Sequence, residues 1–389
     1  MSVMASRPVL RWAVPAGVLV AVLGGGAITT ALSASAGASL PSRSAAQLLV
    51  DLQTAQLDGA SGTVVERADL GLPSIPINVG GDGSAQFNSL VSGSHTLRVW
   101  YSGPDKARVA LLGATGESDV IHNGADTWIW SSADNTAQHT KSTPDAPGLT
   151  PKVTPSGMPT DLPKTPQELA DKLLATVGPT TTVSTDGSAT VAGHAAYELV
   201  LAPKDTSSLI SQVRIAIDGK AHVPTRVEVF AKSAPQRPVF EIAFTQVSFQ
   251  RPDAGVFAFS PPPGAKVTEG DSDAPALPGK PNASKPDASR PDASKPKTAV
   301  IGTGWTSVLV ARIPQDATST APKAKNDQTP SLESILGMLP EVHGSWGSGH
   351  VLQSHLFTAL LTNDGRVLIG AVSTDRLVAA AGDPAAALK

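Results

Sequence analysis

The sequence predicts a mainly β protein of the α+β class, in which an antiparallel sheet precedes a smaller second unit. Apolar residues alternate with polar ones in a series of short segments, each bounded by Gly, Asp, Asn or Ser, as in antiparallel strands. Gly and Pro are abundant, at 35 and 33 residues, and only a few segments have the 3.6-residue period of a helix. A length of 389 residues with 41% hydrophobic content provides one substantial core and allows two domains.

Composition excludes several classes of function. The formal net charge is only −3 and no run of Lys and Arg stands out, so nucleic acid is not an expected partner. The chain contains no cysteine, which excludes thiol catalysis, thiolate metal sites, disulfides and a cysteine-linked lipid anchor.

Residues 1–36 have the features of a signal for export. Arg7 and Arg11 precede an uncharged apolar run at residues 12–32, and residues 34–36 are small enough for a cleavage position. Both a cleaved signal peptide and a retained N-terminal membrane anchor are compatible with a run of about 20 residues. In either case we expect the chain after Ala36 to lie outside the cytoplasm, on the extracytoplasmic face of the membrane or in a periplasm-like space.

Residues 44–268 are expected to form one sheet flanked by two helices. A helix at residues 44–59 begins at a possible cap, Ser44, and ends at Gly59, and a second helix is expected at residues 165–178, after a loop rich in Pro and Thr. Alternating segments predict strands at residues 95–103, 106–113, 117–124, 125–132, 180–185, 194–203, 211–219, 224–232 and 238–249.

The remaining residues predict a linker and a small α+β domain. Residues 269–298 contain a repeated five-residue unit rich in Pro, Ala, Ser and Lys, which is typical of a solvated tether. The domain at residues 299–382 is expected to contain a strand at residues 305–313, a helix at 331–342, a hairpin at 350–372 and a closing helix at 373–382. Asn363, Asp364 and Gly365 are a strong signal for the hairpin turn.

Strand alternation also predicts an apolar face. At residues 213–217, 227–229 and 240–244 the residues on one side are Val, Ile or Phe, whereas Arg and Glu fall on the other side. At least eight strands share this apolar side and only two helices are available to cover it, which leaves room for a hydrophobic cavity. The candidate cavity-lining residues are Tyr101, Trp128, Trp130, Ile215, Val229, Ile242 and Phe244. The alternative is ordinary core packing, and for the two tryptophans half-buried packing on a strand.

Sequence motifs favour binding over catalysis. There is no nucleophile elbow, no phosphate-binding loop with its lysine and no H-E-x-x-H motif. His343, His350 and His355 lie close together in the sequence, but no carboxylate follows at the spacing of a metal ligand. We therefore expect a protein that is not an enzyme and has no cofactor and no metal.

Residues 223–267 carry the longest family-like pattern. A strand that begins at Pro224 is followed by a segment of the form x-I-x-F-T-x-V-x-F and then by x-F-x-F-x-P-P-x-G, in which Phe257 and Phe259 are expected to end the last strand. This pattern resembles the C-terminal signature of the LolA-like lipoprotein carriers and of the N-terminal domain of the RseB/MucB proteins. The resemblance extends over about residues 45–268.

The resemblance implies a curved antiparallel half-barrel, lidded by helices, whose apolar face holds acyl chains. In the carriers the cargo passes from an inner-membrane ABC transporter to an outer-membrane receptor. RseB/MucB-like proteins join the same fold to a smaller second domain and restrain a membrane anti-sigma factor. The expectation is therefore an exported lipid- or lipoprotein-binding protein with acyl chains as its partner. The alternative is an envelope-stress regulator that binds an anti-sigma factor through two domains.

Overall fold

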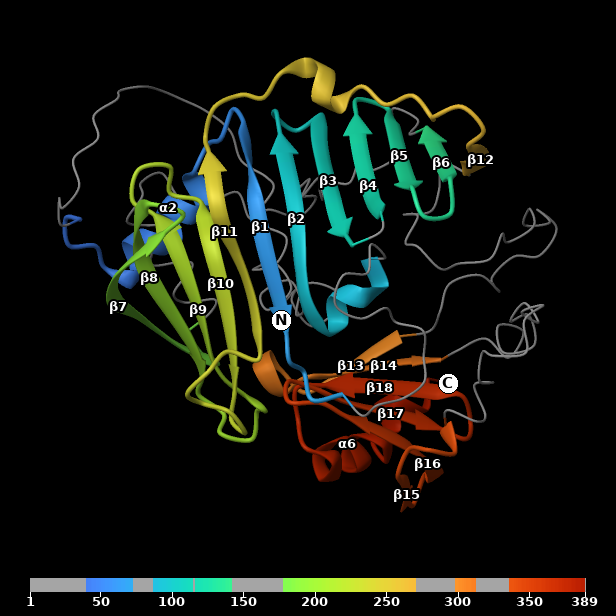
Figure 1. Ribbon diagram of the computed structural model, residues 1–389. Helices are drawn as coiled ribbons and strands as arrows, with labels where there is room; N and C mark the ends of the chain where they lie inside the picture. Colours follow the sequence, from blue (N-terminus) through green and yellow to red (C-terminus); the bar gives the residue numbers. More distant parts are fainter. Residues whose placement is uncertain are drawn as a thin grey trace, which may run out of the picture.

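The computed structural model describes residues 40–72, 87–114, 116–141, 178–270, 298–312 and 336–388. These residues form a mainly β structure with a twelve-stranded mixed sheet, a six-stranded antiparallel sheet and two α-helices (Figure 1). The expected export signal at residues 1–36, the expected helix at residues 165–178 apart from its last residue, and residues 271–297 of the expected linker lie outside the described residues.

The large sheet is built from the first two thirds of the chain. Helix α2 (Ala45–Thr54) precedes it, and two 3-10 helices, η4 (Phe87–Val91) and η5 (Ala254–Phe257), interrupt the succession of strands. The strands are β1 (Ala60–Ala68), β2 (Gly93–Tyr101), β3 (Lys106–Gly113), β4 (Gly116–Asn123), β5 (Asp126–Ser131), β6 (Thr136–Lys141), β7 (Thr181–Val191), β8 (His194–Pro203), β9 (Ile210–Asp218), β10 (Pro224–Ala231), β11 (Phe240–Ser248) and β12 (Lys266–Gly270).

Helix α2 begins where its cap was predicted and ends earlier than expected. The Ser44 side chain accepts a hydrogen bond from the Gln47 backbone N–H, and the Gln47 side chain accepts one from the Ser44 backbone N–H, which completes a capping box. Ala55 leaves the helical conformation, so the helix stops at Thr54 and residues 55–59 connect it to β1. The buried side of α2 carries Leu48, which packs against β7, β8 and β9.

The strand order is β12-β6-β5-β4-β3-β2-β1-β11-β10-β9-β8-β7. Every pair is antiparallel except β12 and β6, which run parallel, so the expectation of a purely antiparallel sheet is wrong at this edge. The parallel pair arises from the course of the chain after β11. In Figure 1 this segment crosses the ends of several strands, through η5, and reaches the far edge of the sheet as β12. A connection of this length permits a parallel pair.

The expected last strand at Phe257 and Phe259 is also absent from that path. Phe257 ends η5, where the Asp253 side chain accepts a hydrogen bond from the Gly255 backbone. Phe257 is fully buried against the sheet, which fixes the crossing segment in place. Three prolines at residues 261–263 then follow, and their missing N–H groups prevent ladder pairing.

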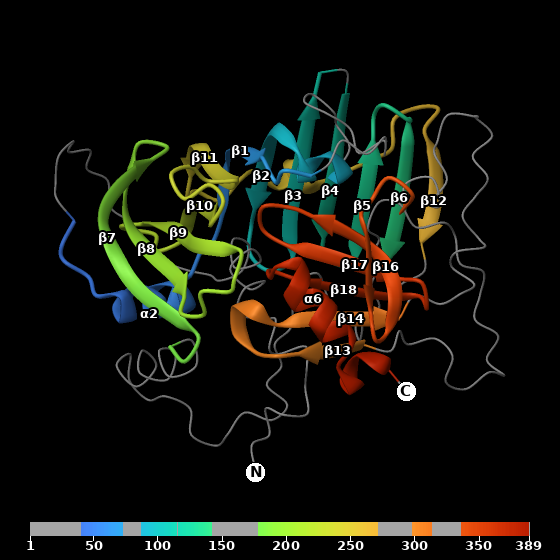
Figure 2. The same cartoon turned by 90° about the horizontal axis from the view of Figure 1, so that it is seen from below.

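The two faces of the large sheet differ in chemistry. The inner face curves around α2 (Figure 2) and carries cross-strand neighbours such as Leu97 and Val64 or Val227 and Ile215. The outer face carries Arg214 and Arg226, which both form ion pairs with Glu198. The prediction that one face is apolar and the other charged is therefore confirmed for these strands.

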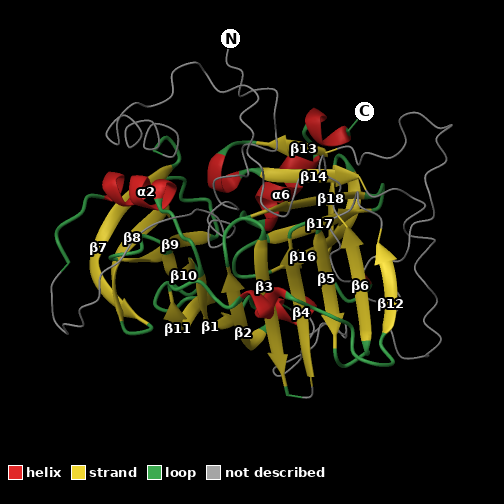
Figure 3. Cartoon of the chain, turned by 90° about the horizontal axis from the view of Figure 1, so that it is seen from above, coloured by secondary structure: helices red, strands yellow, loops and turns green. Residues whose placement is uncertain are grey.

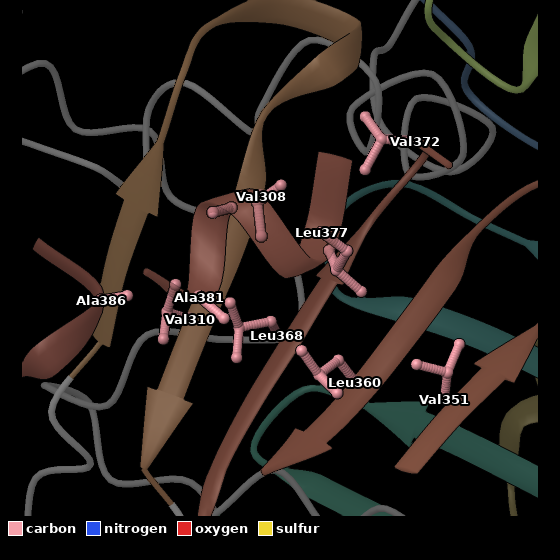
Figure 4. Close-up of a cluster of buried hydrophobic side chains, with 10 residues drawn as sticks. Val308, Val310, Val351, Leu360, Leu368, Val372, Leu377, Ala381 and Ala386 are labelled. Carbon is pink, nitrogen blue, oxygen red and sulfur yellow. The ribbon is translucent and has the colours of Figure 1, made fainter. Parts of the chain in front are cut away.

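The six-stranded sheet has the order β13-β14-β18-β17-β16-β15. The 3-10 helices η6 (Gly304–Thr306) and η7 (Pro384–Ala387) and helix α6 (Thr374–Ala381) accompany it, and α6 packs on the sheet over a buried apolar cluster (Figures 3 and 4). The strands are β13 (Thr298–Ile301), β14 (Val308–Arg312), β15 (Glu341–Gly344), β16 (Gly347–Gln353), β17 (Thr358–Thr362) and β18 (Arg366–Gly370).

Most of the expected elements of this second unit are confirmed. Residues 363–365 turn between β17 and β18, with Gly365 at a φ of 83°, a value that favours glycine. The closing helix is α6. The strand expected from residue 305 begins only at Val308. Of the helix expected at residues 331–342, residues 331–335 lie outside the described residues, and residues 341 and 342 belong to β15.

The two sheets contact each other directly. The Leu209 N–H donates to the Ala371 carbonyl over 2.8 Å, and the Trp305 indole N–H donates to the Thr181 hydroxyl over 2.8 Å. Trp305 also packs against the apolar cluster beneath α2. The second sheet is thus held against the first by a backbone hydrogen bond and by a partly buried tryptophan. Within the described ranges no helix is both long and apolar enough to cross a membrane.

Leu48 provides a test of how α2 contributes to the core. Leu48→Ala is expected to lower the free energy of unfolding by about 2–5 kcal/mol, since the side chain is fully buried and its removal leaves a cavity. Gln53→Ala, on the exposed part of the same helix, serves as the control and is expected to change stability by less than about 0.5 kcal/mol. Urea denaturation measures both, and equal effects would contradict the packing of α2.

Asp205 provides a pH-dependent test of the contact between the sheets. Hydrogen bonds from the Ser207 side chain and backbone, and a further one from Thr306, lower the pKa of Asp205 below its usual value. The carboxylate therefore stabilises the fold above its unfolded pKa of about 3.9, and this stabilisation is lost as pH falls through the lower folded value. Asp205→Asn is expected to cost at most about 1 kcal/mol at pH 7 and nothing near pH 2. If the stability difference between the original protein and Asp205→Asn were the same at pH 2 as at pH 7, the role assigned to the Asp205 carboxylate would be contradicted.

Candidate functional site

An apolar pocket lies on the inner face of the large sheet. Its volume is about 190 Å³, and its walls come from β1, β2 and β3 on one side and from β10 and β11 on the other. Fourteen of its lining residues are hydrophobic or aromatic, and Thr225 and Arg226 are polar. The lining is Leu57, Ala60, Val64, Leu97, Val99, Tyr101, Val109, Val223, Pro224, Thr225, Arg226, Val227, Ile242, Ala243, Phe244 and Phe249.

Within the described residues, helices cover the inner face at two places, and the pocket lies on the apolar surface between them. Helix α2 covers β7 to β9 through Leu48 and its neighbours. Helix η4 covers β1 to β3, where Phe87 and Leu90 pack against Leu111. Ile242 belongs to both clusters and also lines the pocket. The uncovered apolar surface between the two helices is therefore continuous with the core on either side.

Gly62 permits the close approach of Phe244 to β1. A Cβ atom at Gly62 would lie 2.8 Å from the Phe244 ring, closer than real contacts allow, so a larger residue would displace the ring. The pairing of β1 with β11 also shifts register between Thr63 and Val64, as in a β-bulge, which changes how the strand bends. Both features place Phe244 over the wall of the pocket.

The pocket contributes apolar contacts rather than free charge. Arg226 reaches the outer face, where its guanidinium lies 3.4 Å from Glu198 and 3.3 Å from Glu228. Burial raises the pKa of Glu228, although Arg226 opposes this shift. Arg226 is therefore paired with two carboxylates. A hydrocarbon ligand such as an acyl chain would gain binding free energy from this lining mainly through the exclusion of water.

The predicted cavity residues occupy three different places. Tyr101, Ile242 and Phe244 line the pocket. Ile215 and Val229 lie on the same face but belong to the apolar cluster beneath α2, away from the pocket lining.

Trp128 and Trp130 lie on the outer face. Trp128 is paired across the strands with Ile121, which is paired with Arg108, so the tryptophans share the face of the charged residues. Both rings contact Phe259, at centroid distances of 5.3 and 5.9 Å. They hold the segment that crosses from β11 to β12 onto the sheet. The spacing of two residues predicts that the pair share a face, but only the register decides which face it is.

Two lining residues had no signal in the alternation. Leu57 and Val223 come from connections between elements. Apolar residues in loops have no period, so only the folded arrangement brings them to the pocket. Phe249, at the end of the predicted strand 238–249, follows the end of β11 and also lines the pocket.

The described residues contain no group of three side chains that could hold a metal ion. The three C-terminal histidines have different neighbours. In the pairing of β15 with β16, His343 lies opposite Ser348 and His350 lies opposite Glu341. The His355 side chain instead forms a hydrogen bond of 2.9 Å with Ser233 of the large sheet.

Comparison with known families gives one match that covers half of the chain. Residues 74–269 match the family described as "Predicted periplasmic protein (DUF2092)". This range includes β2 to β11 and most of the pocket lining. The chain matches no curated protein sequence.

Solved structures with a similar fold include both groups that the sequence resembles. The Pseudomonas aeruginosa MucA/MucB complex has 14% identity and a TM-score of 0.41, with 86% of this chain and 95% of that chain covered. A LolA superfamily protein from Nitrosomonas europaea has 12% identity and a TM-score of 0.20, with coverage of 56% and 99%. An uncharacterized conserved protein from Thermus thermophilus has 10% identity and a TM-score of 0.32, with coverage of 57% and 97%.

Filling the pocket tests its existence in solution. Val99→Trp is expected to reduce the binding of an environment-sensitive hydrophobic dye at least tenfold, since the larger side chain occupies the space that Val99 borders. Arg98→Trp introduces the same ring at the next residue, which is exposed on the outer face, and is expected to leave dye affinity unchanged. Fluorescence titration measures both affinities. Equal losses, or no loss in Val99→Trp, would contradict the pocket.

Proposed function

We propose that this chain, which belongs to the DUF2092 family of predicted periplasmic proteins, binds an acyl chain of a lipid or lipoprotein in the inner-face pocket. The observation that supports this function is the pocket itself, which is apolar, open between α2 and η4, and bordered by Phe244 and Tyr101. An exported protein meets acyl chains in the membrane it crosses and in lipoproteins anchored there.

The energetics of hydrocarbon burial fit this function. Each methylene that leaves water gains about 0.8 kcal/mol, so ten buried methylenes gain roughly 8 kcal/mol before the cost of ordering the chain. After the cost of ordering the acyl chain is subtracted, the remaining free energy is enough for a dissociation constant in the micromolar to millimolar range. Specific polar contacts are therefore unnecessary for binding, which agrees with the small polar share of the lining.

In this proposal each segment of the chain has a distinct task. The large sheet is an open half-barrel with α2 and η4 as its lids, and residues 44–268 form the ligand-binding domain. Residues 1–36 direct export, as a cleaved signal peptide or an anchor. Residues 271–297 link β12 of the half-barrel to β13 of a small second domain.

A second candidate is a regulator of the RseB/MucB kind, which binds a membrane anti-sigma factor through two domains. The observation that favours it is the contact between the two sheets, in which Trp305 packs into the cluster that adjoins the pocket. A carrier needs no second unit at this position. Capture of a membrane protein by the full chain, with and without added lipid, distinguishes the candidates, since only the regulator is expected to retain such a partner.

Lipid titration tests the acyl-binding function. Phe244→Ser is expected to weaken binding of a fluorescent long-chain fatty acid at least tenfold, because it removes a large apolar wall and introduces a hydroxyl. Phe259→Ser is the matched control, since Phe259 contacts Trp128 and Trp130 on the outer face and its loss leaves the pocket lining intact. Circular dichroism establishes that both variants fold. Unchanged affinity in folded Phe244→Ser would exclude binding at this pocket.

A further inference from the structure

Three buried polar residues form a chain of hydrogen bonds on the inner face. His95 Nδ1 lies 2.9 Å from Glu66 Oε2, and Ser89 Oγ lies 3.0 Å from His95 Nε2. Glu66 and His95 are each 3% exposed and Ser89 is 0% exposed. They come from three separate elements, β1, β2 and η4, so the fold and not local sequence brings them together.

This group, Glu66, His95 and Ser89, adjoins the pocket. Glu66 follows the pocket-lining Val64 by two residues, and His95 precedes the pocket-lining Leu97 by two. Two residues advance about 6.6 Å along a strand and return to the same face. Glu66 is also the direct cross-strand neighbour of Ile242, another lining residue. The polar group is therefore one step along the inner face from the apolar wall.

A purely structural role accounts poorly for this group. Glu66 Oε1 is buried and has no hydrogen-bond partner among the residues that the structure describes, which carries a desolvation cost that an apolar residue would avoid. Burial raises the pKa of Glu66, and His95 only partly opposes the shift. Buried ionisable groups with incomplete partners are concentrated at functional sites.

The order of the three residues has a chemical meaning. When the Glu66 carboxylate accepts a hydrogen bond from Nδ1–H of His95, the other ring nitrogen is left with a free lone pair. That nitrogen, Nε2, then accepts the hydroxyl proton of Ser89. A hydroxyl paired with a base, and a base oriented by a carboxylate, is the arrangement that activates a serine nucleophile on unrelated folds.

We propose that Ser89 is a nucleophile toward carboxylic esters whose long acyl chain occupies the pocket, with His95 as the general base and Glu66 as a positioning residue. The inference goes beyond acyl binding, but it depends on the proposed function for the place of the acyl chain. The substrate class is an ester of a long-chain fatty acid, in which the carbonyl lies at the end of the pocket near η4.

The step is balanced without a cofactor. The Ser89 Oγ–H bond breaks as the proton passes to His95 Nε2, and Oγ forms a bond to the ester carbonyl carbon. The C–O bond to the leaving alcohol breaks, and the alcohol oxygen takes the proton from His95. The products are an acyl ester of Ser89 and a free alcohol. Water then attacks this ester by the same proton path and releases the fatty acid.

Access to Ser89 requires a shift of η4, because the serine is fully buried. The helix has only five residues and ends before Gly93, whose φ is 90°. Phe87 and Leu90 hold it by apolar contacts, and Ser89 holds it by its hydrogen bond to His95. We therefore expect the reaction to be slow, and faster with longer acyl chains that compete for these contacts.

The test uses the full chain and an alkyl fluorophosphonate, a probe that forms a stable adduct with activated serines. Intact mass measurement is expected to show one added probe, and peptide mapping is expected to place it on Ser89. Ser89→Ala is expected to abolish the adduct. His95→Ala is expected to slow labelling about 100-fold or more, the usual contribution of a general base. Ser94→Ala is the matched control, since Ser94 is exposed one residue before His95.

The outcomes separate this inference from acyl binding. Absence of a Ser89 adduct under excess long-chain probe overturns the inference, whether or not the pocket binds fatty acid. An adduct that forms equally fast with a methyl and a long-chain probe overturns the place assigned to the acyl chain. Fatty acid titration of Ser89→Ala provides the independent readout, and retained binding in that variant shows that it folds and that its pocket is intact.

Discussion

The structure depends on one apolar face that, within the described residues, is larger than the helices that cover it. On the inner face of the large sheet, apolar side chains continue from β3 to β8, and water must be excluded from all of them. Helix α2 and helix η4 shield the two flanks, and Trp305 from the second sheet packs at the α2 side. Among the residues that the structure describes, the apolar surface between these elements is shielded by neither helix, and the pocket lies there.

The outer face is stabilised by different means. Arg214, Arg226, Glu198 and Glu228 form a charged network there, and the segment that crosses to β12 covers the other half through Phe257 and Phe259. Arg108 supports this crossing, since it lies 2.7 Å from Asp119 and also donates to the Val256 carbonyl. The crossing segment therefore shields the outer face of these strands, through η5 and Phe259, and its pairing with β6 makes the sheet mixed.

Sequence periodicity predicted what local patterns determine. It indicated β2 to β5 and β7 to β11 of the large sheet, β14 and the hairpin of β17 and β18 in the second sheet, the start of α2, the turn at Asn363 to Gly365, and the separation of apolar and charged faces. It missed what depends on contacts between distant residues. A run ending in Phe257 and Phe259 has strand-like alternation, but burial of Phe257 made it a 3-10 helix. Trp128 and Trp130 share a face as their spacing requires, yet the register turned that face outward. The Glu66, His95 and Ser89 group has no local signature, because Glu66 and His95 are 29 residues apart.

The central claim is that the inner-face pocket holds an acyl chain. The most direct measurement is native mass spectrometry of the protein purified from its own host without detergent, followed by organic extraction of any bound molecule. The account predicts a discrete added mass that extracts as an acyl lipid and disappears when the pocket is filled by Val99→Trp. A protein that carries no lipid from its host, and that gains none from membranes of that host in solution, would contradict it.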